Sequence, residues 1–291
     1  MDTIEKAAAK LAKSGSRSVL PMEQPHQSSD LVESTPSSHD SQSIRKDEVL
    51  PLRERLKTGG FLSFQGDNAQ QIEEYRRIKR PLLMNMDSQG ETRKKASNLI
   101  MVTSSMPGEG KTFTSINLAV SIAMELDRTV LFIDADVHKP AASAQLGIEQ
   151  YPGLTDVLGS KTLSVADVLI KTDVPKITLL SVGCDRNNAN ELLASSNMQA
   201  LMNELAQRYH DRVIIIDTPP ILVTNEASIL VNLVGQVVVV VEAEKTQQSV
   251  LEEALSSIDI ENINIGLVLN KGRISSGKSG YYYGEYGYPG E

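Results

Sequence analysis

Short runs of Val, Ile and Leu alternate with longer segments of helical spacing from residue 97 onward, and this alternation constrains the fold more than any other feature. The apolar runs predict buried strands at 99–104, 129–135, 177–182, 213–217, 237–241 and 265–269. Helical apolar spacing predicts helices at 117–126, 190–209 and 247–258. Strands that are apolar on both faces are covered on both sides, and helical connections imply parallel crossovers. The sequence therefore predicts an α/β fold with a doubly wound, mainly parallel sheet flanked by helices.

A loop with the sequence Ser-Met-Pro-Gly-Glu-Gly-Lys-Thr, from Ser105 to Thr112, follows the first predicted strand and precedes a helix. Gly108 and Gly110 let the backbone curl so that N–H groups face a phosphate, and the helix N-terminus adds its positive dipole end. Lys111 is then placed to bridge the β- and γ-phosphates, and Thr112 to bind Mg²⁺. Ser105 stands where the consensus begins with Gly. The predicted nucleotide-binding residues of this loop are Pro107, Gly108, Glu109, Gly110, Lys111, Thr112 and Phe113.

Aspartates end two further predicted strands. The run Val-Leu-Phe-Ile-Asp-Ala-Asp ends in Asp134 and Asp136, and the run Val-Ile-Ile-Ile-Asp ends in Asp217. Because parallel strands deliver their carboxyl ends to one edge of the sheet, Asp134 and Asp217 are expected beside Lys111 and Thr112. An aspartate at a strand end is also common as a helix cap or turn former, which is the alternative for each taken alone. Together with the phosphate loop, the acids predict phosphoryl transfer that uses ATP and Mg²⁺.

These motifs resemble those of the deviant-Walker P-loop ATPases and, within them, the bacterial tyrosine kinases that regulate polysaccharide chain length. The resemblance extends over 71–291 and rests on the phosphate loop, the Asp-x-Asp motif, the Asp-Thr-Pro-Pro motif and a C-terminal tyrosine cluster. It implies a protein-tyrosine autokinase in which Asp134 acts near the acceptor hydroxyl and the metal. It also implies that Asp136 completes the site and that Asp217 holds the Mg²⁺ shell. On this resemblance the catalytic residues are Lys111, Asp134, Asp136 and Asp217, and the metal-binding residues are Thr112, Asp134 and Asp217.

The sequence departs from the family pattern at two positions and adds one expected contact. His138 stands where the family usually has Arg after the Asp-x-Asp motif, and we assign it no role in chemistry. Ala189 stands where the family's Asn-Pro-x-Glu-Leu-Leu segment has Pro. The strand that ends at Asn270 resembles one from which the wider superfamily often contacts the base. Asn270 is therefore expected to contact the nucleotide.

A charged helical pattern at 68–84 resembles the family's oligomerisation helix, whose motif is Glu-x-x-Arg-x-x-Arg. Glu73, Arg76 and Lys79 fit this motif, with Lys in place of the last Arg. The register that begins one residue later, at Glu74, fits the charges completely, and the sequence leaves both registers open. A solvated helix face is the simpler alternative.

Five of the eight tyrosines lie in the last eleven residues, interleaved with glycines. Glycine loses more conformational entropy on ordering than any other residue, so this segment is not expected to build a core. The expected phospho-acceptors are Tyr281, Tyr282, Tyr283, Tyr286 and Tyr288. Each phosphate would add about −1.5 to −2 charge, so repulsion is expected to open a ring held by unmodified tails. An aromatic tail that packs on a partner is the alternative.

Composition divides the chain into three expected parts. Residues 1–60 are expected to hold a short helix at 2–13 and a disordered linker, because ten of the thirty residues at 14–43 are Ser. Residues 61–275 are expected to form the P-loop kinase domain, and 276–291 the tyrosine-rich autophosphorylation tail.

Charge and hydropathy restrict the classes of partner. With 29 basic and 37 acidic residues the net charge is −8, which argues against general nucleic-acid binding. Mean hydropathy is −0.20, and the longest apolar stretch, 229–241, is shorter than the ~20 residues of a spanning helix, so no membrane span is expected. The N-terminus lacks a signal-peptide pattern, and Cys184 has no second cysteine to pair with. A cytoplasmic location is therefore expected.

The family resemblance implies partners that the residues themselves do not reveal. It implies a homo-oligomeric ring with tail phosphorylation in trans, a transmembrane chain-length determinant that recruits and activates the kinase, and a cognate tyrosine phosphatase. The implied process is exopolysaccharide biosynthesis and export. The alternative is a partitioning ATPase of the Par or Min type, but those proteins carry a signature Lys in the first part of the phosphate loop, where this chain has Met106. A non-catalytic ATP-dependent scaffold is a third interpretation.

Overall fold

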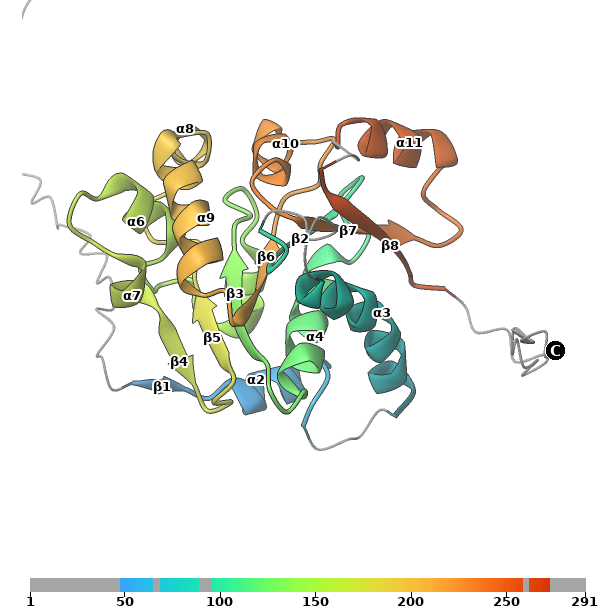
Figure 1. Ribbon diagram of the computed structural model, residues 1–291, viewed down its shortest axis with the longest axis horizontal. Helices are drawn as coiled ribbons and strands as arrows, with labels where there is room; N and C mark the ends of the chain where they lie inside the picture. Colours follow the sequence, from blue (N-terminus) through green and yellow to red (C-terminus); the bar gives the residue numbers. More distant parts are fainter. Residues whose placement is uncertain (1–47, 65–68, 89–95, 259–261, 273–291) are drawn as a thin grey trace, which may run out of the picture. The chain divides into compact units, whose positions relative to one another are not determined.

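The computed structural model describes residues 48–64, 69–88, 96–258 and 262–272, which belong to one compact unit (Figure 1). The helix expected at 2–13, the Ser-rich linker at 14–43 and the tyrosine-rich tail at 276–291 lie outside the described residues. Within the described ranges, no helix combines the length and apolar character that crossing a membrane requires.

The described strands form one eight-stranded sheet in the order β1-β4-β5-β3-β6-β2-β7-β8. Neighbouring strands are parallel throughout, except that β4 and β5 are antiparallel. The strands are β1 (Val49–Leu50), β2 (Leu99–Ser104), β3 (Thr129–Asp134), β4 (Ile170–Thr172), β5 (Ile177–Leu180), β6 (Arg212–Asp217), β7 (Gln236–Glu242) and β8 (Asn264–Asn270). The doubly wound, mainly parallel sheet predicted from the apolar runs is confirmed.

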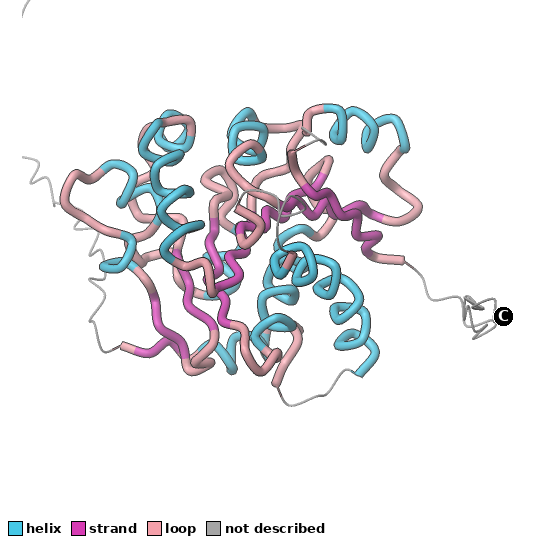
Figure 2. The backbone as a smooth tube through the Cα atoms, viewed as in Figure 1, coloured by secondary structure: helices cyan, strands magenta, loops and turns pink. Residues whose placement is uncertain are grey.

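Helices cover both faces of the sheet (Figure 2). On one face pack α2 (Leu52–Thr58), α3 (Ala69–Asp87), α4 (Lys111–Ala123) and α5 (Ala141–Leu146). On the other pack α6 (Leu154–Gly159), α7 (Val165–Val168), α8 (Ala189–Leu193), α9 (Ser196–Arg208), α10 (Asn225–Val231) and α11 (Gln248–Ser256). Along β2, Ile100 packs into the first layer and Met101 into the second, as the alternation of side chains along a strand requires. Both faces of the central strands are therefore buried, which explains their continuous apolar runs.

Two parts of the sequence-based prediction need correction. The helix expected at 190–209 is two helices, because α8 ends at Leu193 and the Ser195 hydroxyl caps α9 by accepting the Met198 N–H at 3.3 Å. Such a cap favours a new helix start over continuation of the old one. Strands β1 and β4 were not predicted, because two and three residues are too short to show a pattern.

The folded domain also begins before residue 61. Leu50, Leu52 and Leu56 are buried, and β1 pairs in parallel with β4. The Arg53 N–H donates to Asp173 Oδ1 at 3.1 Å, which fixes the start of α2 against the β4–β5 turn. The expected boundary between linker and kinase domain therefore lies too far along the chain. Three leucines spaced through a charged segment are too few to indicate a buried helix in the sequence.

The parallel central strands bring the predicted functional residues to one edge of the sheet. Strand β3 lies beside β6, and their register pairs Asp134 with Asp217. Strand β2 lies on the other side of β6, and the phosphate loop follows it directly. The carboxyl ends of three adjacent strands therefore form the site, as expected for a doubly wound sheet.

Candidate nucleotide and phosphoryl-transfer site

The loop between β2 and α4 has the backbone shape that its glycines predict. Gly108 and Gly110 have positive φ angles of 89° and 98°, which L side chains rarely adopt. At Gly110 there is also no room for a side chain, since an added Cβ would lie 2.1 Å from Asn270 Nδ2. Helix α4 begins at Lys111, so its N-terminal N–H groups and positive dipole end lie at the loop. Pro107 is exposed at the outer part of the loop.

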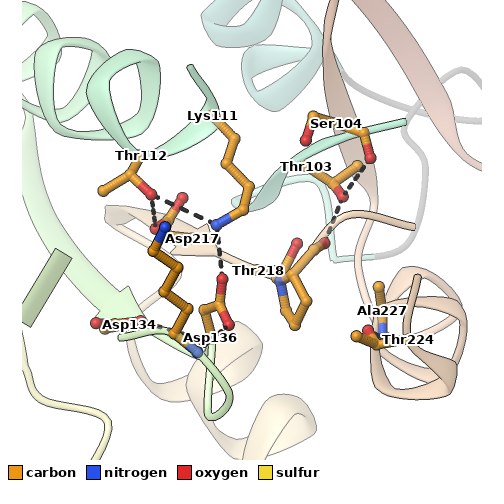
Figure 3. Close-up of polar contacts among 12 residues, drawn as sticks. Thr103, Ser104, Lys111, Thr112, Asp134, Asp136, Asp217, Thr218, Thr224 and Ala227 are labelled. Atoms are coloured by element: carbon orange, nitrogen blue, oxygen red, sulfur yellow. Dashed lines mark hydrogen bonds and ion pairs between the residues drawn. The ribbon is translucent and has the colours of Figure 1, made fainter. Parts of the chain in front are cut away.

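Lys111 projects into a group of carboxylates (Figure 3). Its Nζ lies 2.7 Å from Asp136 Oδ2 and 3.5 Å from Thr112 Oγ1. The Lys111 side chain is 12% exposed and that of Asp136 is 4% exposed. Burial alone would lower the pKa of Lys111, but the nearby carboxylates of Asp217, Asp136 and Asp134 outweigh it and raise this pKa above its ordinary value. Lys111 is therefore held as a cation at the mouth of the phosphate loop.

Asp217, at the end of β6, binds the first turn of α4. Its Oδ2 accepts the Thr112 hydroxyl at 2.8 Å and its Oδ1 accepts the Ser115 hydroxyl at 3.1 Å. Burial raises the pKa of Asp217, and Lys111 and the two hydroxyls oppose that shift. Sequence reasoning missed Ser115, although its spacing of three residues from Thr112 on a helix that starts at the phosphate loop was a usable signal.

Asp134, at the end of β3, is fully buried beside Asp136 (Figure 3). One carboxylate oxygen accepts the Asp136 N–H at 3.1 Å and the other accepts the Ser143 N–H at 2.7 Å. Burial and the neighbouring Asp217 carboxylate raise the pKa of Asp134 to about 7. Asp134 thus has the contacts of a turn former as well as a position beside the other acids. Its contact with Ser143 at the start of α5 could not be read from the sequence.

The site as a whole carries an excess of negative charge. Three aspartates and one lysine meet in a buried space, and unpaired buried charges are costly unless cations or hydrogen bonds offset them. Among the residues that the structure describes, no group of three or more His, Cys, Asp or Glu side chains is arranged to hold a metal by itself. Mg²⁺ is usually bound by one or two carboxylates together with substrate phosphates and water. Thr112 and Asp217 supply a donor set of this kind.

Three side chains predicted to bind the nucleotide have other partners in the structure. Asn270 Nδ2 donates to the carbonyl oxygen of Glu109 at 2.8 Å, so this side chain braces the phosphate loop. Phe113 stacks on Phe61, with ring centroids 5.3 Å apart. The Glu109 side chain is buried and accepts the Met106 N–H at 2.9 Å.

The predicted oligomerisation motif is divided between the surface and the interior. Glu73 and Arg76 are exposed and form an ion pair at 3.2 Å on α3. Lys79 is buried, where its Nζ donates to the carbonyl oxygen of Ser121 at 2.5 Å and lies 2.7 Å from Glu125 Oε1. Lys79 therefore holds α3 against α4 inside the subunit, so its side chain is not on the surface that a second copy would meet.

His138 has a partner that the sequence did not suggest. Its Nε2 lies 3.5 Å from Glu226 Oε2 on α10, and the Glu226 side chain is only 7% exposed. This contact joins the loop after Asp136 to the segment that follows the Asp-Thr-Pro-Pro motif. The structure gives His138 a contact between its loop and helix α10, and no contact with Lys111 or Asp217 is seen among the described interactions.

Comparison with known proteins now places the chain in a family. A family model described as an AAA domain (AAA_31) matches residues 97–266. Tyrosine-protein kinase YwqD of Bacillus subtilis is 35% identical over 194 residues, which cover 66% of this chain and 77% of that protein. The chain belongs to the bacterial tyrosine kinase family. The kinase domain of Escherichia coli tyrosine kinase ETK superposes with a TM-score of 0.62 and 26% identity, covering 81% of this chain and 93% of that domain.

Other members of the family are much longer than this chain. A putative tyrosine-protein kinase, EpsB of Ralstonia nicotianae, is 31% identical over 220 residues, and the match covers 75% of this chain but 28% of EpsB. The names of these relatives favour a kinase over a partitioning ATPase, and the resemblance inferred from the motifs is confirmed.

Proposed function

We propose that this chain is an ATP-dependent protein-tyrosine autokinase that phosphorylates tyrosines of its own C-terminal cluster. The observation that carries the proposal is the meeting of Lys111, Thr112, Asp136 and Asp217 at the end of a phosphate loop, in a chain of the bacterial tyrosine kinase family. A phosphate loop alone would fit many nucleotide-binding proteins. The family relationship supports tyrosine as the acceptor.

Lys111 would release Asp136 and bind the β- and γ-phosphates of ATP. Its ion pair with Asp136 keeps it charged and inside the site until an anion replaces that partner. Thr112 and Asp217 would hold Mg²⁺, which when bound neutralises charge that develops on the phosphates. Since Thr112 and Asp217 already lie in hydrogen-bond contact at 2.8 Å, little rearrangement separates them from shared ligation.

Transfer would form a bond from the tyrosine oxygen to the γ-phosphorus and break the bond from that phosphorus to the oxygen that stays on ADP. The phenolic proton must then leave for a nearby base. Asp134 is our choice for that acceptor, because the family resemblance places the first acid of its motif near the hydroxyl and its environment raises its pKa. Asp136 would shift from Lys111 to complete the site.

The proposed acceptors are Tyr281, Tyr282, Tyr283, Tyr286 and Tyr288, modified in trans within a homo-oligomeric ring. The exposed charged residues Glu73 and Arg76 of α3 would contribute to contacts between copies. We further propose recruitment from the cytoplasm to the inner face of the plasma membrane by a transmembrane chain-length determinant, in exopolysaccharide synthesis and export. A cognate phosphatase would reverse the modification.

The test is incubation of the purified chain with ATP and Mg²⁺, alone and with the cytoplasmic ends of candidate membrane partners, followed by phosphopeptide mass spectrometry. We expect phosphate on the tail tyrosines. Lys111→Met should abolish it, whereas the matched surface change Lys161→Met should not. Mixing the Lys111→Met chain with a second chain that lacks the five tail tyrosines tests transfer in trans.

Steady ATP hydrolysis with an unmodified tail, even with an activating partner present, would overturn the kinase proposal in favour of a partitioning ATPase. An unmodified tail on the Lys111→Met chain of the mixture, while the unaltered chain alone becomes phosphorylated, would overturn transfer in trans and leave the kinase activity intact.

A further inference from the structure

Glu109 poses a physical problem within the phosphate loop. Its side chain is a carboxylate, 3% exposed, in a loop whose backbone is shaped to bind a polyanion. A negative charge at this position would repel phosphates if it faced them. The contacts of Glu109 indicate what the carboxylate does instead.

The carboxylate joins the first half of the loop to a second segment of the chain. One oxygen, Oε2, accepts the Met106 N–H at 2.9 Å, and the other, Oε1, accepts the hydroxyl of Thr246. Thr246 lies in the turn between β7 and α11, where its hydroxyl also accepts the Glu242 N–H at 3.2 Å. The bridge therefore connects the phosphate loop to the end of strand β7.

The second half of the loop is held from the end of β8. Lys271 Nζ donates to the Gly108 carbonyl at 2.6 Å, and Asn270 Nδ2 donates to the Glu109 carbonyl at 2.8 Å. Strand β8 is in turn joined to the β7 turn, because the Ala243 N–H donates to the Asn270 carbonyl at 2.9 Å. Two side chains at the end of β8 thus hold successive carbonyl groups of the loop, while Thr246, beyond the end of β7, holds the Glu109 carboxylate.

These contacts determine where the loop's N–H groups point. A trans peptide unit is planar, and its C=O and N–H point in opposite directions. Holding the Gly108 carbonyl toward Lys271 therefore aims the Glu109 N–H the other way, and holding the Glu109 carbonyl toward Asn270 does the same for the Gly110 N–H. Donors fixed before the ligand arrives cost less entropy when they bind it.

We propose that Glu109 and Thr246 are positioning residues whose hydrogen bond fixes the phosphate loop for nucleoside di- and triphosphates, together with the ties from Asn270 and Lys271. The inference rests on the proposed nucleotide site and goes beyond it, because it makes the β7–α11 turn and the end of β8 determinants of nucleotide affinity. Neither segment belongs to the phosphate-loop motif.

The test compares Thr246→Val with Thr246→Ser by isothermal titration with Mg²⁺-ADP, which requires no phosphoryl transfer. Valine matches threonine in shape but lacks the hydroxyl, so we expect affinity to fall about tenfold, equivalent to about 1.4 kcal/mol. Serine restores the hydroxyl and should restore the affinity. Thr162→Val, in the exposed turn before α7, is the matched control and should bind as the unaltered chain does.

A second variant separates positioning from charge. Glu109→Gln removes the negative charge but keeps the size of the side chain and one acceptor oxygen. If Glu109 acts mainly by repelling phosphates, this variant will bind ADP more tightly, which would overturn the proposal. If it acts by positioning, affinity will fall, and the double variant with Thr246→Val will lose less than the two single losses combined.

The remaining outcomes are also decisive. Unchanged affinity in Thr246→Val would overturn the proposal, as would a loss that Thr246→Ser fails to rescue or that matches a drop in the thermal midpoint of the nucleotide-free chain. Tight ADP binding without tail phosphorylation would overturn the kinase proposal alone. Absence of nucleotide binding by the unaltered chain would overturn both.

Discussion

Lys79 and Lys111 are both withdrawn from solvent, with side chains 6% and 12% exposed, but their surroundings differ in charge balance. Lys79 has one carboxylate, Glu125, and one backbone carbonyl, that of Ser121. Lys111 faces Asp136 and is influenced by two further buried aspartates. The charge around Lys79 is balanced, so that lysine is a structural tie between helices. The aspartates around Lys111 outnumber it, so the charge there is balanced only when further cations bind. This imbalance is typical of a ligand-binding site.

Matched substitutions of the two lysines should give the largest contrast, in triphosphate affinity. Lys111→Met should weaken binding of a non-hydrolysable Mg²⁺-ATP analogue by about a hundredfold, because the β- and γ-phosphates lose their buried cation. Lys79→Met should leave that affinity within about threefold. Titration of a fluorescent analogue measures both. Equal losses of affinity in the two variants would contradict the assignment of Lys111 to binding and of Lys79 to structure.

Stability, in contrast to nucleotide affinity, should depend on Lys79. Lys79→Met should lower the free energy of unfolding by about 1–3 kcal/mol, because the Ser121 carbonyl loses a charged donor and Glu125 loses its partner. Arg80→Met, on the exposed side of the same helix, is the matched control and should change stability by no more than about 0.5 kcal/mol. Urea denaturation monitored by circular dichroism gives both values.

Removing one aspartate from the site around Lys111 should stabilise the nucleotide-free chain. Asp217→Asn retains the size of the side chain and can still bond to Thr112 and Ser115, while repulsion with Asp134 is lost. We expect a gain of about 1 kcal/mol in the free energy of unfolding. Loss of Mg²⁺-dependent nucleotide binding should accompany it. A stability loss in the nucleotide-free state would show that the hydrogen bonds of Asp217 outweigh the repulsion.

The smallest difference between a variant and the unaltered chain is expected in the slope of stability against pH. Burial and Asp217 raise the folded-state pKa of Asp134 to about 7, so between pH 4 and 7 the folded state keeps a proton that the unfolded state releases. The free energy of unfolding should therefore fall as pH rises through this window. Asp217→Asn should flatten that fall, since it removes the neighbouring carboxylate. Urea titrations at several pH values, without nucleotide, measure the difference, and an unchanged slope would contradict the coupling.

The two lysines also differ in how readily the sequence revealed their positions. The position of Lys111 at the start of a helix after the loop could be predicted, because a glycine-containing loop between an apolar strand and a helix is a local pattern with a known geometry. Lys79 was placed by its motif on an oligomerisation surface, and the structure instead buries it against α4. Its carbonyl partner lies 42 residues away in the chain, and a single sequence carries no sign of such a pairing.

The same distinction applies to the rest of the site. The convergence of Asp134 and Asp217 with the phosphate loop followed from strand order in a parallel sheet, and their register in β3 and β6 agrees with it. Sequence reasoning missed Ser143 and Thr246, since each reaches the site from a separate loop. It also began the folded domain too late, because β1 and α2 are recognised only by what they pack against.

The sequence by itself determined the α/β architecture, the phosphate loop and the acids at the strand ends. These features depend on local periodicity and on residues close together in the chain. Only the tertiary structure decided which lysine is a structural tie, how the loop's carbonyl groups are held and where the domain begins. Those outcomes depend on contacts between distant segments, whose free energies are set by burial and by the complementary charge that the fold places beside each group.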